Sequence, residues 1–126
     1  ADTAPLLLFI QTTGKGERFG AYIGDELERH REHYGSDRSV VFRLTPEFAC
    51  WGASGSNSYF LLVNEKGISM GADAQGHVAL FIDYELSHGE THACATFNND
   101  PLIDDGFRFG IAWLEIYSIE GGDNDE

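Results

Sequence analysis

The chain has 126 residues, of which 42% are hydrophobic and 23% are charged, and nine Phe, five Tyr and two Trp provide the bulk of a packed core. Its 21 Asp and Glu outnumber eight Lys and Arg, which gives a formal net charge of −13 at pH 7. Such a charge repels nucleic acids and anionic lipid surfaces, so we expect one globular domain whose partner is a protein and not a nucleic acid.

The first part of the chain predicts a hairpin, a helix and a further strand. Residues 5–13 predict a buried strand, which leads into a turn at Thr-Thr-Gly-Lys-Gly, and 18–24 alternate as its expected hairpin partner. Residues 25–34 lack a period of two and place acidic residues before Arg and His, which predicts a short exposed helix. A β-rich run at 39–44 predicts the next strand.

The second part of the chain predicts four more strands. Residues 45–57, rich in Gly and Ser, are expected to form a long turn before a strand at 58–64. Further strands are predicted at 77–83 and 91–97. The last run, 109–119, is apolar without clean alternation, which predicts a strand that is buried on both faces.

About seven short strands separated by frequent turns predict a mainly β fold. We expect a two-sheet antiparallel β-sandwich with one or two short peripheral helices. This domain should occupy residues 1–120, and the acidic segment 121–126 is expected to be a disordered tail.

The chain contains neither a membrane span nor a disulfide framework. Its longest apolar run, 5–10, is far shorter than the roughly 18 to 20 residues that a spanning helix requires. Cys50 and Cys94 are the only cysteines, and no C-x-x-C pair is present. These features predict a soluble protein of a reducing, cytoplasmic compartment without a metal or other cofactor.

A series of short blocks spread over most of residues 6–119 carries a family resemblance. These blocks are Phe19-Gly20, Tyr59-Phe60, Ile68 to Gly71, Asp83, Leu86, Gly89, Cys94-Ala95-Thr96-Phe97, Leu102 and Glu115-Ile116-Tyr117. Their order and spacing resemble the TLDc domain family, which includes the oxidation resistance proteins. The resemblance implies a sandwich fold with no accepted catalytic reaction.

What the resemblance implies about function is a non-catalytic protein-interaction module. Members of the family protect against oxidative stress, and several bind the vacuolar proton-pumping ATPase and regulate its assembly. The implied module is a monomer in the cytoplasm, peripheral to vesicles or endomembranes. By the same resemblance, Gly20, Gly71 and Gly89 support partner binding.

The sequence departs from the family pattern in three places. Members usually carry an N-terminal helical, aromatic-rich lead-in that this sequence lacks, and 25–38 is rich in Arg and His where Trp and Ser are typical. A loop poorer in glycine occupies 71–76, and Asn98 stands where glycine is usual. A function that depends on those loop glycines is therefore in question.

The segment 87–100, SHGETHACATFNND, raises two alternative functions. A cysteine thiol beside an imidazolium has a lowered pKa, so Cys94 with His92 could serve an antioxidant enzyme or thiol scavenger. A metal site built on His77, His88 and His92 is the other alternative. Against both, a cysteine between two alanines in a β-run is typical of a small buried hydrophobic residue.

Two carboxylates in apolar surroundings complete the candidates. Asp83 and Glu115 must each find hydrogen-bond donors or shift their pKa values upward. Together they could form an acid/base pair, but bonding to backbone amides is the commoner role. We find no Gly-x-Ser-x-Gly motif for a hydrolase.

Overall fold

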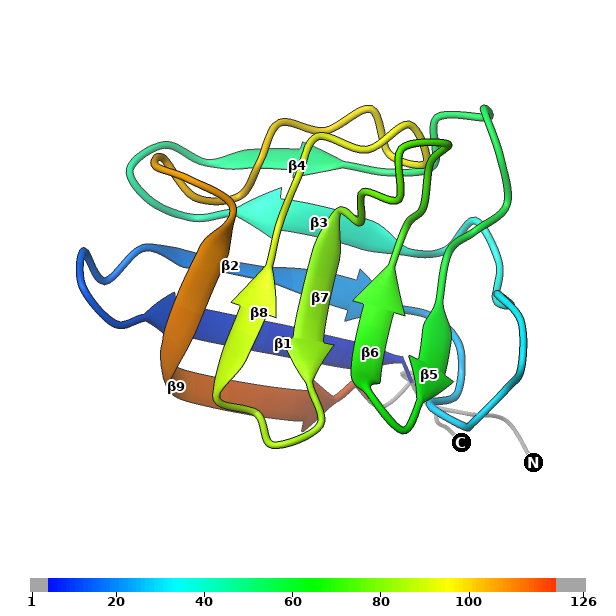
Figure 1. Cartoon of the computed structure of the whole chain (residues 1–126), viewed down its shortest axis with the longest axis horizontal. Coiled ribbons are helices and arrows are strands. Elements are labelled where there is room, and N and C mark those ends of the chain that lie inside the picture. Colours follow the sequence, from blue (N-terminus) through cyan, green and yellow to red (C-terminus); the bar gives the residue numbers. More distant parts are fainter. Residues whose placement is uncertain (1–4, 120–126) are drawn as a thin grey trace, which may run out of the picture.

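The computed structural model describes residues 5–119, which contain nine β-strands and no helix. The strands follow one another as a single antiparallel sheet in the order β4-β3-β2-β1-β9-β8-β7-β6-β5 (Figure 1). They are β1 (Leu6–Thr12), β2 (Arg18–Ile23), β3 (Val40–Arg43), β4 (Ala49–Trp51), β5 (Leu62–Asn64), β6 (Gly67–Met70), β7 (Leu80–Asp83), β8 (His88–Glu90) and β9 (Arg108–Ser118). The predicted tail at 121–126 lies outside the described residues.

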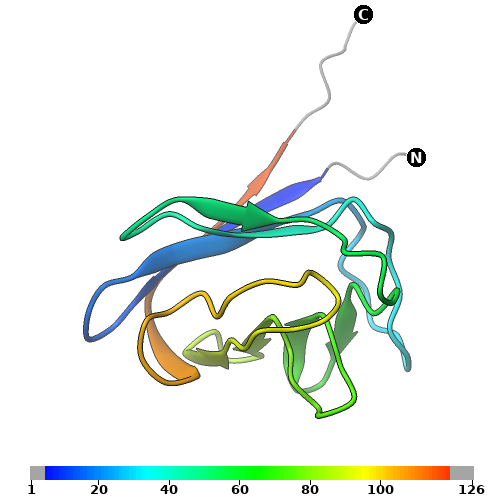
Figure 2. The same cartoon turned by 90° about the horizontal axis from the view of Figure 1, so that it is seen from above.

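The long strand β9 joins the two halves of the sheet. Its first residues pair with β8, and the remainder pairs with β1. The register shifts where Thr12 pairs with Ile111 and Gln11 with Trp113, which leaves Ala112 as a bulge. Near this bulge the sheet folds back on itself, so that the first half (β1–β4) and the second half (β5–β8) face each other (Figure 2).

The prediction of an antiparallel, mainly β fold is confirmed, whereas two separate sheets are not. Since β9 forms hydrogen bonds with both halves, the sheet is continuous from one edge strand to the other. No helix of the described residues is long and apolar enough to span a membrane.

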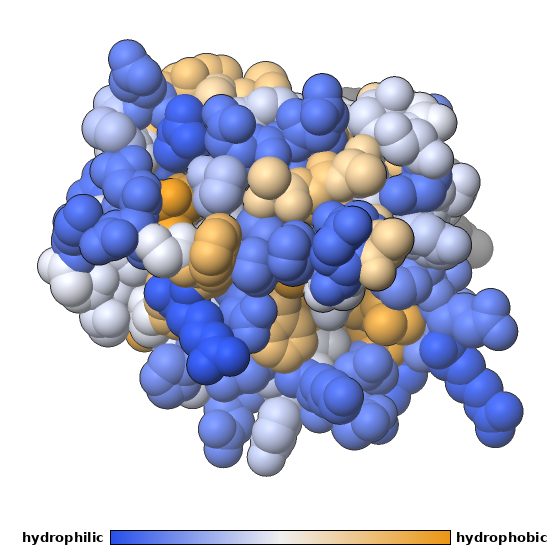
Figure 3. Space-filling view, turned by 45° about the horizontal axis from the view of Figure 1, so that its top comes forward, coloured by the Kyte–Doolittle hydropathy of each residue, from blue (hydrophilic) through white to orange (hydrophobic). Residues whose placement is uncertain are grey.

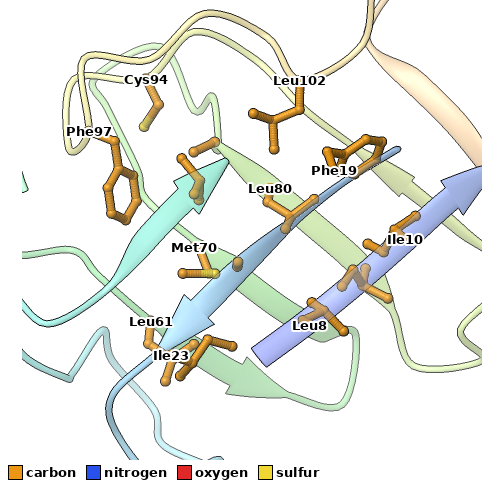
Figure 4. Packing of buried hydrophobic residues seen from close by; sticks show 14 of the residues in the cluster. Leu8, Ile10, Phe19, Ile23, Leu61, Met70, Leu80, Cys94, Phe97 and Leu102 are labelled. Atoms are coloured by element: carbon orange, nitrogen blue, oxygen red, sulfur yellow. The ribbon is translucent and has the colours of Figure 1, made fainter. Parts of the chain in front are cut away.

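The core lies between the two halves of the sheet. Alternate side chains of β1 and β2, such as Leu8, Ile10 and Phe19, point inward and meet Leu80 of the second half (Figure 4). Phe19 is fully buried and contacts the edge of Phe109 at a centroid distance of 5.0 Å. Burying a side chain of this size stabilises the fold by about 1.5–3 kcal/mol, so this layer holds the halves together.

The helix predicted at 25–34 is wrong. The segment runs beside β5 instead, because the backbone N–H groups of His30 and Tyr34 donate to the carbonyls of Val63 and Leu61. These amides therefore have acceptors outside the segment in place of carbonyls four residues earlier. The hydroxyl of Tyr34 also donates to the Glu26 carbonyl at 2.7 Å, which brings the two ends of the segment together.

Three strand predictions also need correction. The expected turn 45–57 contains β4, and only the last three residues of 58–64 form a strand. Residues 91–97 do not form a strand, because the segment ends in a turn in which the backbone N–H groups of Phe97 and Asn98 donate to the carbonyl of Cys94. Thus β4 pairs with β3 inside the expected turn, whereas residues 58–61 and 91–97 contain β-forming residues but lie outside the strands.

The burial predicted for 109–119 is wrong as well. Leu114 packs against the core, but Trp113 is 58% exposed and Tyr117 is 48% exposed. The bulge at Ala112 displaces the alternation by one residue, so the run shows no simple period although it has one inner and one outer face.

Candidate functional site

The outer surface of the first half of the sheet is an aromatic face. Three registered rows of side chains cross β2, β1 and β9 there, and β3 extends two of them. Their neighbours along each strand, such as Leu8 and Ile10, point into the core, so this set points outward. We call it the outer aromatic face: Leu7, Phe9, Gln11, Arg18, Gly20, Tyr22, Val40, Phe42, Trp113, Glu115 and Tyr117.

Phe9 is the centre of this face. Its ring meets Phe42 on one side and Tyr117 on the other, each with a centroid distance of 5.8 Å and an edge-to-face angle. Such pairs contribute about 0.5–1.5 kcal/mol beyond their buried area. The three rings therefore hold one another in place on the outside of the sheet.

Gly20 allows Phe42 to lie flat against β2. A Cβ atom at this position would stand 2.9 Å from Cζ of Phe42 and would clash with the carbonyl oxygen of Leu8. Only glycine fits this close approach of ring and backbone. The role of Gly20 on this face is therefore to shape it.

A groove of about 420 Å³ opens on the outer aromatic face. Phe9 and Trp113 provide apolar walls, and Arg18 and Glu115 provide its only formal charges. The hydroxyl of Tyr117 donates to Oε1 of Glu115 at 2.8 Å. This hydrogen bond, followed by desolvation, raises the pKa of Tyr117 above its usual range. The phenol of Tyr117 therefore keeps its proton and donates it as a hydrogen bond to the carboxylate of Glu115.

Gly71 lies next to Cys94 in the interior. Its φ of +86° favours glycine, and a Cβ atom would stand 2.9 Å from the Cys94 sulfur. Cys94 is only 3% exposed, and its Sγ lies 3.7 Å from the His77 carbonyl and from Oγ1 of Thr96. The structure therefore places this thiol in the core, away from solvent.

The histidines are only partly brought together. His92 stacks between His77 and Phe107, with centroid distances of 4.5 Å on both sides. Its Nε2 lies 3.2 Å from Glu90, so its ring nitrogen faces a carboxylate rather than Cys94. His88 lies apart, beside Ser87. Residues 5–119 contain no group of three metal-binding side chains close enough to hold an ion.

Asp83 and Glu115 lie on different halves of the sheet. Asp83 ends β7, and its Oδ1 accepts the backbone N–H groups of Ser87 and His88 at 2.9 and 3.2 Å. Desolvation acts to raise the pKa of Asp83, but these hydrogen bonds outweigh it and lower the pKa. Asp83 thus stabilises the turn into β8, and the described geometry does not join it to Glu115.

Gly89 has a packing role like that of Gly20. It pairs with Phe109, and a Cβ atom there would stand 2.5 Å from Cζ of that ring. The added atom would also clash with the carbonyl of Phe81. A phenylalanine thus lies over a glycine in both halves, outside the sheet at Phe42 and inside it at Phe109.

The outer surface of the second half differs from the aromatic face. Its groove of about 450 Å³ is lined by Phe81 together with Asp83, His88, Glu90 and Arg108. The charges form pairs, with Arg108 3.6 Å from Glu90 and His88 3.8 Å from Asp83. On the side of the molecule shown in Figure 3, hydrophilic residues dominate and apolar ones appear only in small separate groups.

The sequence reasoning missed the residues that define the outer aromatic face. Trp113 and Phe9 were assigned to two buried runs, and Phe42 to a strand without a distinctive role. Pairing the runs 6–12 and 113–118 as neighbours would have placed Phe9, Glu115 and Trp113 on one surface. The missing alternation near Ala112 is the signal of a bulge that would have set this register.

The family of the chain follows from sequence comparison. The model of the family described as the TLDc domain matches residues 1–120. The chain belongs to the TLDc domain family. This TLDc domain is 32% identical over 117 residues to nuclear receptor coactivator 7 of Homo sapiens, covering 93% of the chain and 12% of that protein.

Oxidation resistance proteins are similar as well. Oxidation resistance protein 1 of Homo sapiens is 32% identical over 116 residues, which cover 92% of the chain and 13% of that protein. The protein of the same name from Podospora anserina is 36% identical over 72 residues, or 57% of the chain and 20% of that protein. The chain therefore spans about an eighth of the length of its human relatives.

Asn98 shows how this TLDc domain accommodates one departure from the family pattern. Asn98 has a φ of +53°, in the left-handed region that glycine and asparagine adopt most readily. Its N–H donates to the Cys94 carbonyl at 2.7 Å and closes the turn. The turn at residue 98 therefore has a backbone conformation that asparagine adopts readily.

Proposed function

We propose that this TLDc domain is a non-catalytic protein-interaction module that binds a subunit of the vacuolar proton-pumping ATPase. The observation that carries the proposal is the outer aromatic face, on which about half of the surface of Trp113 and of Tyr117 is exposed to solvent. Aromatic side chains grouped on a sheet surface are typical of protein contacts, where they supply much of the binding energy. The family resemblance supports the identity of the partner.

The positions of the candidate catalytic residues also support a module without turnover. Cys94 lies in the core, and His92 contacts Glu90 and two rings rather than the thiol. Asp83 stabilises a turn on the opposite half from Glu115. Some relatives are named for oxidation resistance. In this proposal, such resistance results from the action of the bound partner, and binding takes place in the cytoplasm at endomembranes.

Binding to the purified cytoplasmic sector of the vacuolar ATPase tests the proposal. The wild-type domain and the Trp113→Ser variant should be immobilised in equal amounts, with Tyr84→Ser as the control. Tyr84 is 69% exposed on a turn outside the outer aromatic face, so both variants remove an exposed aromatic ring. We expect capture by the wild type and the control, and at least a tenfold loss for Trp113→Ser.

The glycines are less suitable for this test. Substitutions at Gly20, Gly71 or Gly89 meet neighbouring atoms in the folded chain, so lost binding would not separate a contact from misfolding. If the ATPase sector fails to bind the folded wild-type domain, the proposed partner is wrong. Equal loss for Trp113→Ser and Tyr84→Ser would contradict the assignment of the outer aromatic face.

A further inference from the structure

The outer aromatic face is electrically neutral within a strongly acidic domain. Of its eleven residues only Arg18 and Glu115 carry charge, and these charges cancel, whereas the whole chain carries −13. The acidic field of the remaining surface draws basic molecules toward the domain. Contact on the face itself then depends on apolar fit and on the few charges within it.

Glu115 is the charge best placed to select a partner. It pairs across the sheet with Phe9 and is half-buried in the groove. Its Oε1 accepts the Tyr117 hydroxyl, and no basic side chain within residues 5–119 forms an ion pair with it. Arg18 lines the same groove without forming an ion pair with Glu115. A carboxylate beside apolar walls and without an ion-pair partner is a strong acceptor for a charge-assisted hydrogen bond from an incoming Lys or Arg.

From this arrangement we infer that the groove receives an apolar side chain of a basic protein segment, with a neighbouring Lys or Arg of that segment bound to Glu115. Phe9 and Trp113 contact the apolar side chain, and the Tyr117 hydroxyl holds the carboxylate in position. This inference rests on the proposed function and specifies the chemistry that the partner presents to the outer aromatic face.

Charge disfavours the other occupants of this face. A second copy of the chain would bring another −13 charges to the interface, and an anionic membrane surface would be repelled in the same way. A basic segment gains from the same field. A basic segment with an apolar side chain is therefore the occupant that is complementary both to the neutral aromatic face and to the acidic surface around it.

Three synthetic 12-residue peptides test the inference, with leucine alternating with lysine, glutamate or serine. Affinity should be measured by titration calorimetry, with the Trp113 indole signal in NMR spectra as the reporter of location. We expect the lysine peptide to bind the wild-type domain and to shift the Trp113 signal. The glutamate peptide should bind at least tenfold more weakly.

Matched variants separate the two contacts. Glu115→Gln should weaken the lysine peptide about five- to tenfold and leave the serine peptide unchanged, because only the charge is lost. Trp113→Ser should weaken both peptides. Glu85→Gln and Tyr84→Ser are the controls, since both residues are exposed on a turn away from the groove. Thermal unfolding should confirm that every variant is folded.

Several results would overturn the inference. Equal effects of Glu115→Gln and Glu85→Gln would remove the role of the carboxylate. A Trp113-dependent dimer in sedimentation, or Trp113-dependent binding to neutral phosphatidylcholine vesicles without peptide binding, would assign the face to a different occupant. If the lysine peptide binds as expected while the ATPase sector does not, the inference stands and the proposed partner fails. If capture of the ATPase sector depends on Trp113 but not on Glu115, the proposed partner stands and the inference about Glu115 fails.

Discussion

The two halves of one sheet present opposite kinds of outer surface. On the first half, Phe9 packs between two other rings and leaves Trp113 largely uncovered. On the second half, the groove around Phe81 is bordered by acidic and basic side chains that pair with one another. Both halves are antiparallel, and they differ in the side chains that their strands direct outward.

This difference indicates which surface is stable in contact with water and which would gain from binding a partner. The side chain of Arg108 is 86% exposed and pairs with Glu90, so this charge pair is solvated and gains little from a partner. An exposed indole beside a half-buried carboxylate gains from being covered by matching groups. The comparison therefore separates a solvated surface from a docking surface within one continuous sheet.

Replacing an inward ring should cost far more stability than replacing an outward one. Phe19 is fully buried between the halves, so Phe19→Ala should lower the free energy of unfolding by about 3–5 kcal/mol. Trp113→Ala should lower it by less than about 1 kcal/mol, because the indole is mostly in water. Urea unfolding measures both. A large loss for Trp113→Ala would mean that the indole supports the fold rather than a partner.

A methyl group added at Gly20, beside Phe42, or at Gly89, beside Phe109, should disturb the packing of the strands around it. We expect Gly20→Ala and Gly89→Ala each to destabilise the domain by about 2–3 kcal/mol, because ring and backbone must both move. Gly52→Ala is the matched control, since a Cβ there has open space. The same urea experiment compares all three, and a Gly20 or Gly89 variant as stable as Gly52→Ala would contradict the packing described.

The sequence predicted the parts of the fold that have strong local patterns. The alternating hairpin at β1 and β2 and the run at β3 are found as expected, because their inward residues form the core. The segment 25–34 was mistaken for a helix because its hydrogen bonds go to residues 61 and 63, which local propensity does not reveal.

The candidate site was harder to predict because it depends on register. Cys94 was expected in the core and lies there, but within a loop rather than a strand. Trp113 and Phe9 are about a hundred residues apart and meet only because a bulge fixes how β9 pairs with β1. A one-residue change of register would exchange the inner and outer faces, so composition alone could not locate the aromatic face.

The two cysteines should differ sharply in reactivity. Cys50 is exposed on β4, whereas Cys94 is buried beside Gly71. In the native domain, Ellman's reagent should modify one thiol quickly and the second only on unfolding. Cys94→Ser should remove the slow phase and cost about 1 kcal/mol, since the hydroxyl can use the nearby carbonyl of His77. Two fast equivalents in the wild type would revive the antioxidant alternative.

The smallest expected effect concerns the charge on Asp83, at the edge of the solvated surface. Its lowered pKa means that the folded state favours the carboxylate, so its stabilisation is fully present above the unfolded pKa of about 4 and is lost as pH falls through the folded value. Asp83→Asn keeps an oxygen acceptor for the amides of Ser87 and His88 but removes the charge.

The variant should therefore be slightly less stable than the wild type at pH 6, and the difference should shrink as pH falls through the lowered pKa of Asp83 in the folded state. Glu85→Gln, on the adjacent turn, controls for the change in net charge. Urea unfolding across this pH range measures the gap. If the difference in the free energy of unfolding between Asp83→Asn and the wild type stayed constant with pH, the charge of Asp83 would not stabilise the turn. The turn of the second half would then depend on packing, as the aromatic first half does.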